Sequence, residues 1–113
     1  MEFIQYQIYQ CCSDFPGRFL GLAELRTHGL SLCGENYRLV YSGKRTPPQS
    51  IDYFLEELFM CFSTEAPPVG FAGWMMSTSD VVVVNSDGKR RAFFCDSIEF
   101  KAVPSLAEKI DAA

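Results

Sequence analysis

The stretch that decides the fold is DVVVVNSDGKRRAFFC, residues 80–95. Its four valines and its later Phe-Phe pair are β-branched and aromatic residues, which favour strands. Between them lies Asp87-Gly88, a dipeptide typical of two-residue hairpin turns. The sequence therefore predicts two antiparallel strands joined at residues 87–88.

A turn at that position also fixes the register of the two strands. The pairs that it predicts are Val84–Arg91, Val83–Ala92, Val82–Phe93, Val81–Phe94, Asp80–Cys95 and Ser79–Asp96. Both faces of the ribbon are then apolar near its middle. Such a ribbon must be covered on both faces or lie centrally in a sheet.

The clearest helix signal runs over residues 50–62, upstream of the hairpin. Its large apolar residues recur on one face of a helical period, namely Ile51, Phe54, Leu55, Leu58, Phe59 and Phe62. Ser50 suits the N-cap position, and Pro47-Pro48 block an earlier start. We expect an amphipathic helix that packs its apolar stripe on the sheet.

The remaining segments complete a single domain over residues 1–113. Residues 3–9 and 37–42 read as strands, 98–103 as an extended segment, and 22–28 and 106–110 as short helices, the first closed by Gly29. The expected fold class is α+β: a mainly antiparallel sheet with one amphipathic helix packed on a face and short additional helices.

Composition excludes several classes of function. The net charge is −4 and the pI about 4.9, which argues against general nucleic-acid binding, since that binding requires a basic face. No stretch approaches the roughly 18 apolar residues of a membrane helix, and the first residues lack the pattern of a signal peptide. We expect a cytoplasmic protein without membrane insertion.

The five cysteines show no C-x-x-C spacing, so no zinc or redox site is predicted. Cys61 and Cys95 lie in apolar runs and are expected to be buried. Free thiols also suit a reducing cytosol. Nothing in the sequence calls for a cofactor.

The hairpin region resembles the YodL-like domain family. The blocks that carry the resemblance are FAG at 71–73, STSDVVV at 77–83 and AFFCDS at 92–97, with weaker blocks YQIY at 6–9 and YRLVY at 37–41. The family usually has a polar pair where this chain has Trp74-Met75, and a glycine where it has Glu99. The resemblance implies a bacterial protein, often from Firmicutes, with relatives in large proteins of mobile genetic elements. It implies no reaction, because no activity is settled for the family.

One candidate site is a polar cluster at the open end of the hairpin, formed by Ser77, Ser79, Asp80, Asp96 and Ser97. Two carboxylates with hydroxyls can bind a cation or transfer protons. The same residue types also end strands by bonding to local backbone N–H groups. We prefer this structural interpretation because no His or Lys accompanies the motif. No catalytic residue and no metal ligand is assigned.

The other candidate site is the apolar segment formed by Phe71, Trp74, Met75 and Met76, beside a Pro/Gly loop. Trp and Met are favoured at adaptable interfaces, and they equally serve to close a core. Two lesser features have ordinary explanations: His28 suits a helix C-terminus, and Lys89-Arg90-Arg91 suits a solvated hairpin tip.

The sequence therefore favours a small non-catalytic interaction module that binds an unknown protein partner or itself through residues 71–76. The alternative is a domain that binds a small ligand or cation, or an enzyme, using Asp80 and Asp96. A nucleic-acid contact at Lys89-Arg90-Arg91 is a weaker third option.

Overall fold

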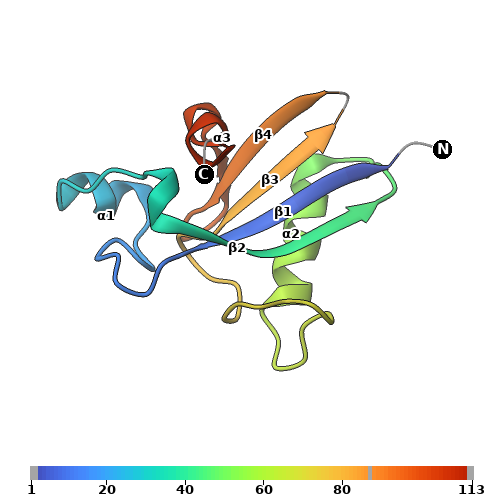
Figure 1. Ribbon diagram of the computed structural model, residues 1–113, viewed down its shortest axis with the longest axis horizontal. Helices are drawn as coiled ribbons and strands as arrows, with labels where there is room; N and C mark the ends of the chain where they lie inside the picture. The colour runs from blue at the N-terminus through green and yellow to red at the C-terminus, as the bar shows by residue number, and fades with distance from the viewer. Residues whose placement is uncertain (1–2, 87, 112–113) are drawn as a thin grey trace.

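The computed structural model describes residues 3–86 and 88–111. Within these described residues, five strands and four helices follow one another (Figure 1) in the order β1 (Ile4–Cys11), α1 (Leu22–Thr27), η1 (Gly34–Asn36, a 3₁₀ turn), β2 (Tyr37–Arg45), α2 (Ile51–Phe62), β3 (Val81–Ser86), β4 (Lys89–Cys95), β5 (Phe100–Ala102) and α3 (Pro104–Asp111). The expected α+β class is confirmed.

The hairpin forms in the expected register. Val81 pairs with Phe94 and Val84 with Arg91, and the pairing extends to Ser86 and Lys89, which leaves two residues for the turn. Asp87 lies outside the described residues. Gly88 has φ +77°, a left-handed conformation that glycine adopts without a steric cost.

The hairpin is embedded in a five-stranded sheet of order β2-β1-β3-β4-β5, in which every neighbouring pair is antiparallel. β3 is the central strand, because β1 pairs with it along its other edge. Its four valines are between 0% and 1% exposed. The ribbon's two apolar faces are therefore explained by cover on both sides of the sheet.

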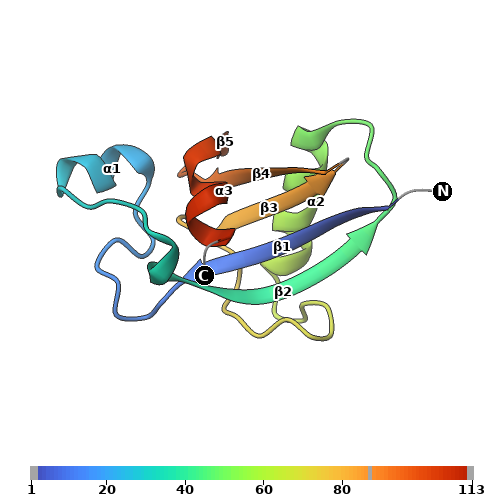
Figure 2. The ribbon, with the colours of Figure 1, turned by 45° about the horizontal axis from the view of Figure 1, so that its top comes forward.

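Successive residues of β3 point to opposite faces and enter two separate cores. Val82 and Val84 pack with α2 in one core. Val81 and Val83 pack in the other core with residues of α1 and α3. Figure 2 shows α2 behind the sheet and α3 in front of it.

Helix α2 forms where the apolar stripe predicts it. The Ser50 hydroxyl accepts a hydrogen bond from the Tyr53 N–H at 3.3 Å and so caps the first turn. Four stripe residues are buried, and Ile51 and Phe59 are partly buried against the same core; the four are Phe54, Leu55, Leu58 and Phe62. Each such side chain contributes about 1.5–3 kcal/mol of burial before the entropic cost.

The short helices also form, with shifted ends. Gly29 ends α1 with φ +68°, as expected. α3 begins at Pro104 because a proline fits the first helical position. β1 continues through Cys11, which is 1% exposed, two residues beyond the strand that the sequence predicts over residues 3–9.

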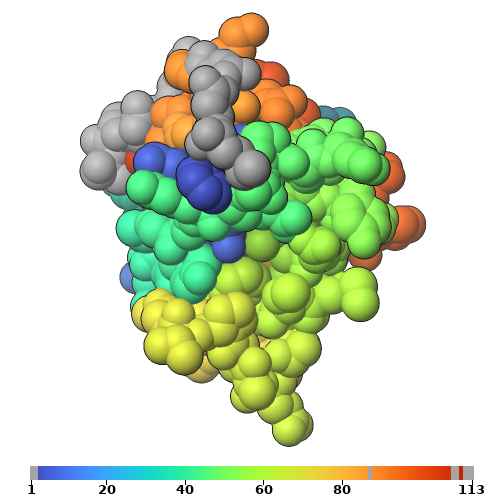
Figure 3. Space-filling view, turned by 90° about the vertical axis from the view of Figure 1, so that its right-hand side faces the viewer, coloured from blue at the N-terminus to red at the C-terminus, as the bar shows by residue number. Residues whose placement is uncertain are grey.

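The prediction that Cys61 is buried is wrong. Cys61 is exposed, whereas Cys95 is buried as expected. Cys61 lies off the apolar stripe of α2, so its position on the helical period outweighs its apolar neighbours. In Figure 3 the segment that follows α2 projects at the bottom of the view.

In the part of the chain that the structure describes, no helix has the length and apolar character needed to span a bilayer.

Candidate functional site

Asp80, at the open end of the hairpin, is 2% exposed and points into the protein. Its Oδ2 accepts hydrogen bonds from the Ser77 N–H at 2.9 Å and from Gln10 Nε2 at 3.0 Å. Burial raises the pKa of Asp80 to about 7, against the lowering effects of these two hydrogen bonds and of the Arg18 charge. The carboxyl therefore holds the loop before β3 against the end of β1.

Gln10 joins Asp80 to the segment that contains Trp74. Its Oε1 accepts a hydrogen bond from the Trp74 N–H and its Nε2 donates one to the Trp74 carbonyl, both at 2.9 Å. The Gln10 amide thus pairs with both backbone groups of Trp74, as the backbone of an adjacent strand would. Gly73 is required beside it, because a Cβ there would collide with Gln10 Oε1. Gln10 is 2% exposed and was not singled out from the sequence. The available signal was its place on the same strand face as Ile4, Tyr6 and Ile8.

Ser79 attaches the loop after β1 to the hairpin. Its Oγ accepts from the Phe19 N–H at 2.9 Å, and its carbonyl accepts from the Tyr37 hydroxyl at 2.9 Å. Its φ is +83°, a conformation that costs about 1 kcal/mol or more for a residue with a side chain. Burial raises the pKa of Tyr37 far above its ordinary value. These contacts give Ser79 a structural role.

Asp96 caps helix α1 from a distant part of the chain. Its Oδ1 accepts from the Leu22 N–H at 3.1 Å and from the Ser97 N–H at 2.9 Å. The residue before the helix is Gly21, which offers no side chain to cap it, and a Cβ there would lie 2.5 Å from the Asp96 Oδ1. The Asp96 Oδ2 also lies 3.9 Å from Lys101 Nζ. A carboxylate is favourable at this position because it meets unpaired helix N–H groups.

The two carboxylates of the expected polar cluster thus bond to different segments. Asp80 faces Gln10, and Asp96 faces α1. The pKa of the Cys95 thiol is raised to about 12, mainly by burial and to a smaller extent by the charges of Asp80 and Asp96. Among the residues described, no group of three or more His, Cys, Asp or Glu side chains could hold a metal ion.

The apolar segment from Phe71 to Met76 divides between core and surface. Met76 is 2% exposed and packs in the same core as α2. The centre of the Phe71 ring lies 5.0 Å from the centre of the Phe62 ring. Trp74 and Met75 are 52% and 56% exposed. The structure therefore leaves two of the four residues available to a partner.

Two further residues extend this exposed area, and neither was singled out from the sequence. The Arg18 guanidinium lies 4.6 Å from the centre of the Trp74 ring and 4.4 Å from that of Phe19. Phe19 is 50% exposed. We name Arg18, Phe19, Trp74 and Met75 the Trp74 surface. Only the tertiary structure joins residues 18–19 to residues 74–75.

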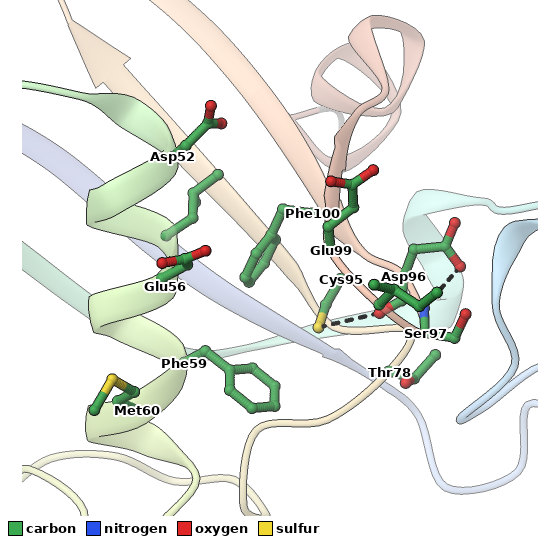
Figure 4. Close-up of a pocket in the computed structure, with 12 residues that line it drawn as sticks. Asp52, Glu56, Phe59, Met60, Thr78, Cys95, Asp96, Ser97, Glu99 and Phe100 are labelled. Atoms are coloured by element: carbon green, nitrogen blue, oxygen red, sulfur yellow. Dashed lines mark hydrogen bonds between the residues drawn. The ribbon is translucent and has the colours of Figure 1, made fainter.

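A groove lies between α2 and the turn from β4 to β5, with a volume of about 550 Å³ (Figure 4). Asp52 and Glu56 reach it from the helix and Glu99 from the turn, with the rings of Phe59 and Phe100 between them. Asp96 and Ser97 also line it, but their side chains are directed away from α2. Leu55 and Cys95 complete its apolar floor. We name this hollow the α2–β5 groove.

The lesser candidates stay at the surface. His28 is exposed at the end of α1. Lys89 and Arg91 are exposed at the start of β4, where the Arg91 guanidinium lies 5.6 Å from the centre of the Phe93 ring. The basic triplet is thus spread along a strand rather than gathered in a pocket.

These features define a small α+β domain in which the polar side chains at the open end of the hairpin fasten loops to an antiparallel sheet. The chain belongs to the YodL-like domain family, whose model matches residues 5–106. The resemblance seen in the sequence is therefore confirmed over nearly the whole chain. A search of curated proteins and a search of solved structures each found no significant match.

Proposed function

We propose that this domain is a non-catalytic interaction module that binds a protein partner through the Trp74 surface. One observation carries the proposal: Trp74 is half exposed although its backbone is fixed by two hydrogen bonds with the side chain of the buried Gln10, one donated and one accepted by that amide. Tryptophan and arginine are, together with tyrosine, the residue types most enriched among those that dominate binding energy. Here the two are already stacked on one another.

A rigid anchor lowers the entropic cost of binding, because little side-chain and loop freedom is left to lose. The Trp74 surface meets this condition from both sides. Gln10 holds the Trp74 backbone, and Ser79 holds that of Phe19. The exposed apolar rings therefore project from a fixed frame.

The alternative proposal, a ligand-binding or enzymatic site at Asp80 and Asp96, is favoured by one observation, the raised pKa of Asp80. A carboxyl that titrates near neutral pH is suited to proton transfer. Burial of Asp80 and the separate hydrogen-bond partners of Asp96 support the interaction module instead. Binding of a small ligand or cation to the purified domain that Asp80→Asn abolishes and Trp74→Ala keeps would favour the alternative.

The proposal places the domain in the cytoplasm, in keeping with its five free cysteines. The setting suggested by the family resemblance, a bacterial protein related to mobile-element proteins, is part of the same proposal.

The test is affinity capture from the host organism, with wild type compared with Trp74→Ala. Tyr53→Ala is the matched control, because Tyr53 is an aromatic residue that is 64% exposed on α2. We expect a partner that Trp74→Ala loses and Tyr53→Ala keeps, with direct binding reproduced by the purified pair. A partner set that is identical for all three proteins refutes the proposal.

Light scattering of the purified protein separates a partner from self-association. A dimer that Trp74→Ala dissociates would assign the surface to a second copy of the chain. Salt-sensitive binding of DNA or RNA at low ionic strength would instead support the weaker option at Lys89-Arg90-Arg91.

A further inference from the structure

We propose that the α2–β5 groove is a docking site for a basic peptide segment of a partner protein, in which lysine or arginine side chains flank an apolar anchor. The groove lies on residues outside the Trp74 surface, and the inference does not depend on that surface.

The shape and floor of the groove suit an apolar side chain. Its volume of about 550 Å³ falls within the range of sites that enclose small ligands or side chains. Phe59 and Phe100 lie on its floor, and two large apolar side chains lie at its mouth with little cover: Met60 is 71% exposed and Ile98 is 96% exposed. An anchor in the groove would remove part of this apolar area from water.

The charge around the groove selects the kind of peptide. Asp52 and Glu56 are exposed one helical turn apart on α2, and Glu99 is exposed on the opposite wall (Figure 4). The Asp96 carboxylate is turned toward the start of α1 and is not counted in this rim. None of the described residues that line the groove is basic. A segment with positive charges on both sides of an apolar residue therefore complements both walls and the floor.

Other occupants fit less well. The acidic rim repels the phosphates of nucleic acids and anionic lipids. The carboxylates stand on separate walls, and the described residues contain no group close enough to hold a metal ion. An apolar side chain of a peptide can pack on the floor between the walls, whereas a bare cation gains nothing from that apolar surface.

The test measures, by fluorescence anisotropy at low salt, binding of a fluorescein-labelled peptide of about 12 residues made of lysine and leucine. Its leucines are spaced three and four residues apart, so that they share one face of a helix. The test variant is Asp52→Asn/Glu56→Gln. The matched control is Asp14→Asn/Glu35→Gln, which removes the same charge at two exposed positions outside the groove. We expect roughly tenfold weaker binding for the groove variant and less than about twofold for the control.

Two further measurements separate the contributions. A lysine/glycine peptide of equal charge is expected to bind at least about tenfold more weakly than the lysine/leucine peptide, and Ile98→Ser is expected to weaken the lysine/leucine peptide. Trp74→Ala is expected to leave its affinity unchanged, so failure here is distinguishable from failure of the proposed function.

Three results would overturn the inference. The first is equal loss of binding in the groove and control variants, which would show attraction to net charge alone. The second is equal binding of the two peptides, which would show that the apolar floor takes no part. The third is a dimer of the purified domain that the groove variant dissociates, which would make the occupant a second copy.

Discussion

The buried carboxyl of Asp80 makes the stability of this domain depend on pH in a specific direction. Asp80 has a folded-state pKa of about 7 against an ordinary value of 3.8, because burial penalises its charged form. The folded state therefore binds the proton more tightly than the unfolded chain does. The contribution of Asp80 to stability is greatest below about pH 4 and is lost as the pH rises through 7.

The size of the effect follows from the two pKa values. A rise from 3.8 to about 7 corresponds to about 4 kcal/mol, which ionisation of Asp80 removes from the free energy of unfolding. This change is a large part of the free energy of unfolding, which is about 5–15 kcal/mol for domains of this kind. The asparagine side chain in Asp80→Asn cannot ionise, and its oxygen can still accept hydrogen bonds from the Ser77 N–H and from Gln10 Nε2. The free energy of unfolding of the variant minus that of wild type is expected to increase by about 4 kcal/mol from pH 4 to pH 8.

Urea denaturation followed by tryptophan fluorescence measures this difference. Trp74 is the chain's one tryptophan, and its backbone is bonded to the same Gln10 that bonds Asp80. Asp14→Asn, which changes an exposed carboxylate, is the control, and its difference from wild type is expected to stay within about 0.5 kcal/mol. A difference for Asp80→Asn that is equal at pH 4 and pH 8 would refute the reasoning.

Three other predictions concern packing and thiols. Gly73→Ala is expected to destabilise the domain by about 1–3 kcal/mol in the same urea assay, because the new methyl group displaces the Gln10 amide; an unchanged midpoint would contradict this. Phe54→Ala is expected to cost about 3–5 kcal/mol, since Phe54 is fully buried between α2 and the sheet, and calorimetry showing a loss below about 1 kcal/mol would count against that packing. Alkylation mapped by mass spectrometry is expected to modify Cys61 well before Cys95, which is buried and whose pKa is raised to about 12; the reverse order would contradict the placement of both thiols.

Several parts of the fold were predictable because they rest on local chemistry. The hairpin register follows from a two-residue turn and strands of fixed period, so one dipeptide sets every pair from Val81–Phe94 to Ser86–Lys89. Helix α2 follows from a stripe of apolar residues and a capping serine. These signals need no knowledge of distant segments.

The site needed information that no local pattern contains. The sequence grouped Asp80 with Asp96 by their places in the hairpin, and the structure separates them because each bonds a different distant segment, Gln10 or the start of α1. The sequence likewise indicated Trp74 and Met75, and omitted Arg18 and Phe19, which come from another part of the chain.

By itself the sequence determined where the strands and the helices α1, α2 and α3 form, and which face of α2 is apolar, since backbone sterics and side-chain period act over a few residues; it did not indicate η1. Tertiary structure alone decided that β1 lies between β2 and β3, that Gln10 is buried beside Asp80, and that a groove forms between α2 and β5. The physical reason is that these outcomes depend on contacts across most of the chain, where burial of apolar area and the satisfaction of buried polar groups select one arrangement among many with the same local pattern.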